Sequence, residues 1–293
     1  MHGRNGTKLF GICSTIFLLG LAPSWAQLDL RIETPKASYL QFSPIPFTVR
    51  IKNLGASELR LTENQGKPWL EMIIQSRDGQ LIAPEKIFLP PDKTLRPGQS
   101  ASIPLDLTPH YLIRDTGGYR ARASVRLPSG ETLMTDSLDF LIGRGEVIWT
   151  VPRGDGEERR IYSLLKFYEG PNVGLYLRVE VPRKNLVYPS RRLGAYLPLG
   201  KPAAEFDPQN NLHLLYAVAA GTHRLTVVNP DGQVLREETR TQGTEKPTLQ
   251  KRTDGEVSVQ GGIVQLPSSL RERLSTLQAR IGAQAPPADP IQP

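Results

Sequence analysis

Residues 27–143 contain several short stretches in which apolar and polar positions alternate. Phe47, Val49 and Ile51 alternate with polar neighbours, and residues 138–142 repeat the pattern near the end of the region. A period of two places one face against a core and leaves the other in water, as in half-buried β-strands. Turn signals separate these stretches. The region therefore predicts about seven strands, the number typical of an immunoglobulin-like (Ig-like) β-sandwich.

Residues 115–119 read Asp-Thr-Gly-Gly-Tyr and lead into the longest alternating stretch. A D-x-G-x-Y run at such a place resembles the tyrosine corner of Ig-like sandwiches, in which the Tyr hydroxyl bonds to the backbone upstream. We therefore expect structural roles for Asp115, Gly117 and a buried Tyr119. We expect a further structural role for Trp69, which begins another buried strand.

The order of these features resembles the bacterial intracellular proteinase inhibitor family and related Ig-like modules. An alternating strand ends in Asn, and a Trp-bearing strand ends in Asp-Gly; an L-x-P-G-Q turn and the D-x-G-x-Y run follow. The resemblance is confined to the first domain. It implies an Ig-like fold, and it makes peptidase inhibition an alternative function.

Strand patterns resume at residue 146 and continue to residue 262, which predicts a second β-rich domain. Val147, Trp149 and Val151 alternate with polar or small residues at its start. Residues 206–235 resemble one blade of a β-propeller. Because a propeller needs about four or more such blades, we expect blade-like hairpins in a small sheet or sandwich instead.

The two ends of the chain have patterns of their own. Residues 1–26 combine a basic start, an apolar stretch and a small-x-small sequence before Gln27, which predicts a cleaved signal peptide. Residues 267–282 place apolar side chains on one helical face, which predicts a short amphipathic helix. Residues 283–293 contain four prolines, and we expect them to form a disordered tail.

Signal cleavage also changes the composition. It would remove Cys13, the only cysteine, together with two basic residues and no acidic one. The mature chain then has 34 basic and 29 acidic residues and a net charge of +5. Without cysteine it has no disulfide and no Cys metal site. We expect an exported bacterial protein of the periplasm or extracellular space. It should have no transmembrane span after cleavage and no nucleic-acid partner.

Residues with the chemistry for catalysis or metal binding are few. The mature chain has three histidines, His110, His213 and His223, and no two of them stand at metal-ligand spacing. Nucleophile-elbow, P-loop and dinucleotide-binding glycine motifs are absent from the sequence. We therefore expect no catalytic residue, no metal and no cofactor, and we predict a protein that is not an enzyme. A hydrolase whose active-site residues are dispersed along the chain stays open as an alternative.

Residues 182–202 are the strongest candidate for a binding surface. The segment lacks a clear period, and no acid occurs between Glu180 and Glu205. Long loops in compact domains are often functional, and Arg and Tyr are enriched at recognition sites. The predicted binding residues are Arg183, Lys184, Tyr188, Arg191, Arg192 and Tyr196.

This segment predicts a non-catalytic binding or scaffolding protein that recognises its partner through loops. An envelope protein or an anionic glycan would suit the basic and aromatic side chains. Arg120, Arg122 and Arg126 form a second basic row on one strand face. We expect that row to be a solvated face of the sheet.

Overall fold

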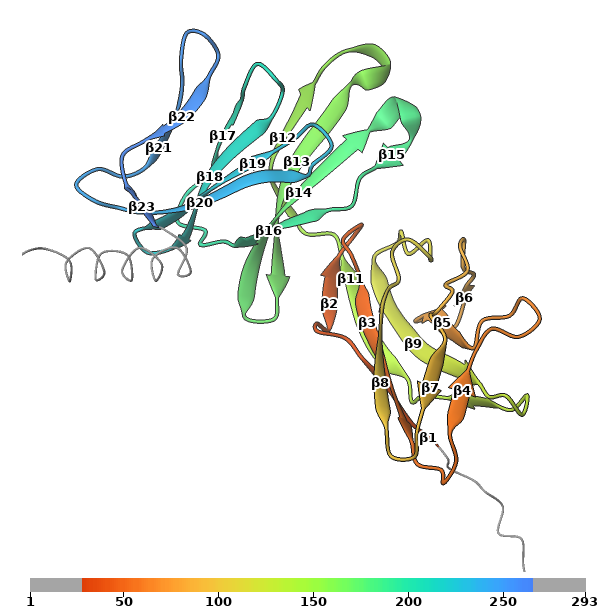
Figure 1. Cartoon of the computed structure of the whole chain (residues 1–293). Helices are drawn as coiled ribbons and strands as arrows, with labels where there is room; N and C mark the ends of the chain where they lie inside the picture. Colours follow the sequence, from red (N-terminus) through yellow and green to blue (C-terminus); the bar gives the residue numbers. More distant parts are fainter. Residues whose placement is uncertain (1–27, 266–293) are drawn as a thin grey trace, which may run out of the picture.

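The computed structural model describes residues 28–265 of the chain (Figure 1). The predicted signal peptide (1–26), amphipathic helix (267–282) and tail (283–293) lie outside the described residues. Within the described range the regular elements are β-strands, joined by two 3-10 turns, η1 (Gly156–Glu158) and η2 (Pro182–Lys184). The predicted all-β class is confirmed.

Strands β1–β11 form two main sheets in the first domain. A three-stranded sheet has the order β1–β3–β8, and a six-stranded sheet has the order β2–β11–β9–β5–β6, with β10 paired to β9. Strands β4 and β7 form a separate ribbon. The bounds are β1 Leu28–Glu33, β2 Ser38–Leu40, β3 Pro46–Asn53, β4 Leu59–Leu61, β5 Leu70–Ser76, β6 Leu81–Ile82, β7 Lys93–Leu95, β8 Ser100–Asp106, β9 Gly117–Arg126, β10 Thr132–Met134 and β11 Leu138–Gly143.

One hydrophobic core joins these two sheets. It takes alternate residues of β3 and β8 from the smaller sheet and of β5, β9 and β11 from the larger one. On β3, for example, Phe47, Val49 and Ile51 are buried, whereas Arg50 and Lys52 are exposed. The alternation in the sequence therefore has its expected cause, because one face of each sheet is dry and the other is wet.

The second domain likewise has two main sheets, and each of them has five strands. The first has the order β12–β13–β14–β15 with β16 paired to β14, and the second has the order β17–β18–β19–β20–β23. Strands β21 and β22 form a hairpin of their own. The bounds are β12 Glu146–Arg153, β13 Arg160–Glu169, β14 Asn172–Val181, β15 Leu186–Val187, β16 Arg191–Ala195, β17 Ala203–Phe206, β18 Leu212–Ala219, β19 Thr222–Val228, β20 Val234–Thr241, β21 Thr248–Lys251, β22 Val257–Gln260 and β23 Ile263–Gln265.

Both five-stranded sheets contribute to a second core. Leu164 of β13 and Leu177 of β14 belong to the same buried cluster as Phe206 of β17 and Leu214 of β18. The sequence that resembles a propeller blade forms β17–β20, four consecutive antiparallel strands of one sheet. It is thus part of a two-sheet arrangement that shares one core.

The other face of β13 and β14 packs against the first domain. Leu165, Phe167 and Tyr176 form a small buried cluster with Leu40 of β2. Because both faces of β13 and β14 are covered, their buried residues run almost without interruption. We call this contact the domain junction.

The chain crosses the junction through a glycine-rich connection between β11 and β12. A Cβ atom on Gly143 would lie 2.6 Å from the Phe167 ring, and one on Gly145 would lie 2.7 Å from Leu40 Cδ1. Gly145 also has a φ of +74°, in the left-handed region that side chains disfavour. The close packing of the two domains therefore requires glycine at these positions.

Candidate functional site

Residues 182–202 are not one long loop. The segment contains η2, β15 and β16, and the last two strands pair with β14. The expectation of an irregular loop is therefore wrong for about half of its length. Three of its six predicted binding residues belong to two polar groups, and the other three have separate surroundings.

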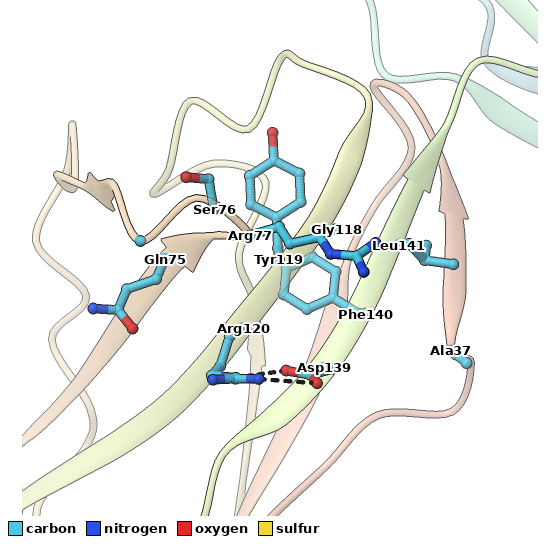
Figure 2. Close-up of a pocket in the computed structure, with 11 residues that line it drawn as sticks. Ala37, Gln75, Ser76, Arg77, Gly118, Tyr119, Arg120, Asp139, Phe140 and Leu141 are labelled. Atoms are coloured by element: carbon cyan, nitrogen blue, oxygen red, sulfur yellow. Dashed lines mark hydrogen bonds and ion pairs between the residues drawn. The ribbon is translucent and has the colours of Figure 1, made fainter.

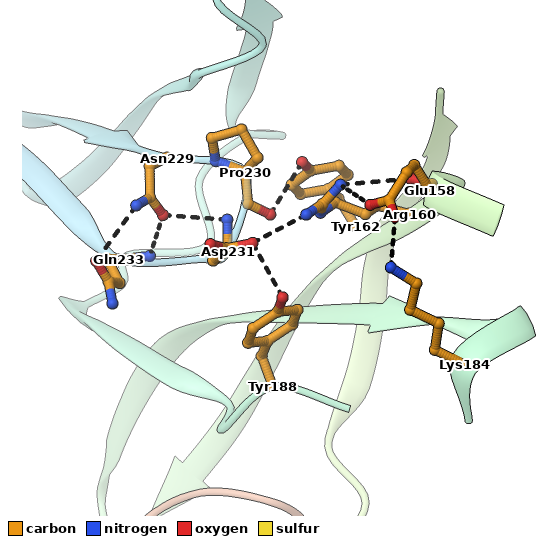
Figure 3. Close-up of polar contacts among 9 residues, drawn as sticks. All are labelled: Glu158, Arg160, Tyr162, Lys184, Tyr188, Asn229, Pro230, Asp231 and Gln233. Carbon is orange, nitrogen blue, oxygen red and sulfur yellow. Dashed lines mark hydrogen bonds and ion pairs between the residues drawn. The ribbon is translucent and has the colours of Figure 1, made fainter. Parts of the chain in front are cut away.

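The first group surrounds Asp231 at one end of the second domain (Figure 3). The Asp231 carboxylate accepts hydrogen bonds from the Tyr188 hydroxyl and from Arg160, each at 3.0 Å. Lys184 forms an ion pair with Glu158, which also lies 3.5 Å from Arg160. The hydrogen bond and the charge of Lys184 lower the pKa of Glu158. Lys184 and Tyr188 are thus engaged within the protein.

A tight turn fixes Asp231 in this group. Asn229 Oδ1 accepts the backbone N–H of Asp231 at 3.1 Å and that of Gln233 at 2.8 Å, as Figure 3 shows. The Pro230 carbonyl accepts the Tyr162 hydroxyl at 3.2 Å. Asx turns of this kind place the following side chain rigidly. The turn therefore joins the β19–β20 connection to β13 and to residues 182–188.

The second group is centred on Glu169 at the domain junction. The guanidinium of Arg192 makes a fork with the two carboxylate oxygens, with N–O distances of 2.7 to 3.0 Å. Lys36 of the first domain and the Tyr176 hydroxyl also donate to Glu169. Burial alone would raise the pKa of Glu169, but the donors Arg192, Lys36 and Tyr176 outweigh it and lower the pKa to about 2. Burial and the bond to Glu169 raise the pKa of Tyr176.

The remaining three predicted residues have no common partner. Tyr196 is buried in the second core, and its hydroxyl donates to the Gly200 carbonyl at 2.8 Å. Arg183 is exposed and lies 3.8 Å from Glu157. Arg191 is exposed and forms no ion pair or side-chain hydrogen bond within residues 28–265. Arg191 is therefore the predicted residue most available to a partner.

Arg191 lines a cavity between the two domains, which we call the junction groove. Its volume is about 450 Å³. It combines three basic side chains, two tyrosines and four prolines. The first domain contributes Pro35, Lys36, Tyr39, Ser43, Pro44 and Pro46, and the second contributes Tyr176, Pro189, Ser190, Arg191 and Arg192. The structure thus brings Arg191 and Arg192 together with Lys36, a residue that sequence reasoning missed.

The second basic surface lies on the outer face of the six-stranded sheet (Figure 2). A cavity of about 460 Å³ lies there beside Gly118. Arg120 and Asp139 bound the cavity and form a two-pronged ion pair at 2.7 and 3.3 Å, marked in Figure 2. The hydrogen bond from Arg120 lowers the pKa of Asp139. Arg122 and Arg126 form no ion pair among the described residues, so this face keeps unpaired positive charge.

The residues with expected structural roles lie in the first core or beside it. The Tyr119 hydroxyl donates to the Asp115 carbonyl at 2.9 Å, four residues upstream. Its ring stacks on Phe140 at 5.6 Å between centroids. Gly117 has a φ of +151°, which few side chains tolerate. Trp69 is almost fully buried. The Tyr119–Asp115 hydrogen bond thus holds the segment that leads into β9 against the start of that strand.

The three histidines have separate surroundings. His213 lies 3.0 Å from Asp207, whose other oxygen accepts the backbone N–H groups of Gln209 and Asn211. His223 lies on β19 and pairs with Ala217 rather than with His213. Within residues 28–265 no group of three or more potential ligands is close enough to hold a metal ion. The Asp207–His213 pair thus belongs to the turn between β17 and β18.

Glu169 and Asp231 are the acids that organise the two groups, and sequence reasoning named neither. Glu169 is a lone acid at the end of an apolar strand, and Asp231 lies in a turn sequence. No local pattern tells such residues from solvated ones.

Comparison with known proteins gives no family. No protein-family profile matches the chain, and no curated protein matches it. A sporulation control protein, Spo0M from Bacillus subtilis, is 9% identical over 88% of this chain and 99% of its own, with a TM-score of 0.30.

Two chaperones give similar values. The Escherichia coli chaperone DraB is 10% identical over 72% of this chain and 96% of its own, with a TM-score of 0.24. The YadV chaperone is 12% identical over 73% and 99%, again with a TM-score of 0.24. At such scores these likenesses carry no inference about function. Within residues 28–265 no helix has the length and apolar character of a membrane span.

Proposed function

We propose that this chain is an exported, non-catalytic binding protein that holds a segment of a partner protein in the junction groove. Its first domain would be an Ig-like sandwich, for which the Tyr119–Asp115 bond and the shared core of two sheets are the support. The observation that carries the binding proposal is the groove itself, where unpaired Arg191 lies among residues of both domains.

The lining of the groove favours a peptide over a sugar. Its four prolines supply no backbone N–H donors. A glycan needs many donors and acceptors for its hydroxyl groups, whereas a peptide segment can pack side chains on proline rings. All four prolines, Pro35, Pro44, Pro46 and Pro189, are exposed on the groove, whereas Tyr39 and Tyr176 are buried beneath its surface.

The charges favour an acidic segment. Lys36 and Arg192 both contact Glu169, so one acid balances part of their charge. Arg191 adds a further positive charge that no acid within the described residues neutralises. Positive charge at the mouth of a groove speeds the encounter with an acidic partner and selects against basic ones.

A photo-crosslinking amino acid at position 191 tests this proposal, with position 252 on the β21–β22 turn as the matched control. Both native residues are exposed arginines. In cells of the source, adducts should form at 191 and not at 252, and mass spectrometry of the digested adduct should find peptides of a second protein. Mass spectrometry of the same purified protein should find Gln27 at its N-terminus.

The charge variants complete the test. Arg191→Glu should weaken binding of the identified partner by about fivefold, the scale of roughly 1 kcal/mol for an exposed ion pair. Arg252→Glu should leave it unchanged. Equal adducts at both positions would contradict binding in the junction groove. So would an Arg191→Glu variant that binds the partner as tightly as wild type. An adduct that glycosidase shortens and that yields no peptide of a second protein would identify a glycan instead.

A further inference from the structure

A second cavity lies in the second domain, away from the junction groove. The β21–β22 hairpin lies beside the sheet β17–β18–β19–β20–β23, and β21 contacts β17 (Figure 1). Leu249 and Val259 of the hairpin pack on Leu215, Leu225 and Val227 of the sheet. The hairpin thus makes a small core of its own with the sheet beneath it.

Two polar contacts hold the hairpin in place. Lys251 Nζ donates to the Phe206 carbonyl at 2.7 Å, and Arg240 Nη1 donates to the Gly261 carbonyl at 2.9 Å. They tie both of its sides to the sheet. The space at its Pro247 end is therefore bounded by fixed walls and is a preformed cavity.

This cavity, the hairpin pocket, has a volume of about 500 Å³. Leu215, Ala217 and Leu249 form apolar parts of its wall, and Lys201 and Lys246 are exposed on its lining. No Asp or Glu is among the lining residues. A pocket of this size with few polar groups suits a small molecule, and its two lysines suit a negative charge on that molecule.

A second observation, at His223, also indicates that the hairpin pocket binds a ligand. The side chain lines the pocket, the residue is only 8% exposed, and its Nδ1 atom is buried without a hydrogen-bond partner. Buried polar atoms are nearly always hydrogen-bonded. Burial first, and the charge of Lys246 second, lower the pKa of His223. The neutral imidazole keeps one N–H to donate and one nitrogen to accept.

We propose that the hairpin pocket binds a small carboxylate with an apolar body. The carboxylate lies between Lys201 and Lys246, and the apolar body lies on Leu215 and Leu249. His223 supplies a neutral hydrogen-bonding group beside the carboxylate. A carboxylate satisfies both lysines and an imidazole N–H at once, because each of its oxygens accepts more than one hydrogen bond.

Octanoate is the probe, titrated calorimetrically into the mature protein, with 1-octanol and inorganic phosphate as comparison ligands. Octanoate should bind one-to-one and saturably. Octanol lacks the charge and phosphate lacks the apolar body, so each should bind at least about fivefold more weakly. Nitrogen NMR of the histidine side chains should show His223 responding to octanoate and His110 unchanged.

Two variants locate the binding. Lys201→Ala with Lys246→Ala should weaken octanoate about three- to tenfold, whereas Lys52→Ala with Lys67→Ala in the first domain should not. Ala217→Phe fills the cavity and should abolish binding; if it fails to fold by circular dichroism, the double lysine variant decides. Absence of saturable binding, equal binding of octanol, or unchanged binding by the double variant would overturn the proposal.

Discussion

Strands β9 and β14 have the same length and a central place in their sheets, yet they are buried differently. Each has ten residues; β9 alternates between buried and accessible positions, whereas β14 has six consecutive buried ones. The outer face of β9 carries Arg120 and Arg122 into water. The equivalent face of β14 carries Tyr176 and Arg178 against the first domain.

The difference shows what each face requires of a charged side chain: on the covered face of β14 it needs partners within the protein, and on the exposed face of β9 it does not. Arg178 is almost fully buried, donates to the Gln41 carbonyl at 3.2 Å and lies over the Phe42 ring. Burial lowers the pKa of its guanidinium. Arg122 needs no such partner because water solvates it. Uninterrupted burial therefore marks a strand with both faces covered, and alternation marks a strand with one face in water.

Leu40→Ala gives the largest expected effect because it removes the centre of the junction. Leu40 has no exposed surface and packs on Leu165 and Phe167. The cost should be about 3 kcal/mol, as for other buried Leu→Ala changes. Urea unfolding followed by fluorescence should change from one transition to two as the domains separate. Val125→Ala, in the first core, should lower stability without separating them; equal profiles would mean that the junction does not couple the domains.

Glu169→Gln should have an intermediate effect of about 2 kcal/mol at pH 7, the scale of hydrogen bonds to charged groups. The folded-state pKa of about 2 lies below the ordinary value of 4.5. The carboxylate therefore contributes fully above that ordinary value, and the contribution is lost as pH falls toward 2. The stability difference between wild type and variant should shrink between pH 5 and pH 2. A difference independent of pH would contradict the charge network.

Tyr119→Phe should have the smallest effect of the three, about 1 kcal/mol, because it removes one hydrogen bond and keeps the stacked ring. The unfolding midpoint of the first domain measures it. Tyr168→Phe is the matched control, since Tyr168 is exposed on β13. If both variants unfold at the wild-type midpoint, the corner hydroxyl adds nothing to stability.

Alternation in the sequence was enough to predict the all-β class. The alternating apolar residues of β3 and β9 lie on the buried face of their strands, so the local pattern follows the local burial. The binding segment was harder. Residues 182–202 contain no acid, yet Glu157, Glu158, Glu169 and Asp231 contact side chains of this segment in the folded protein. Lys36 and Glu169 are 133 residues apart. Local patterns carry no record of such long-range charge pairing, so they cannot separate engaged Arg192 from free Arg191.

The two glycines between the domains have a mechanical consequence. A load applied to the first domain passes through β11 into Gly143 and Gly145, where the neighbouring Phe167 and Leu40 leave no room for a side chain. Only one residue, Arg144, separates these two glycines, so tension would pass to β12 without first extending a linker. Resistance to bending between the domains would then depend on a few packed side chains rather than on the length of the connection.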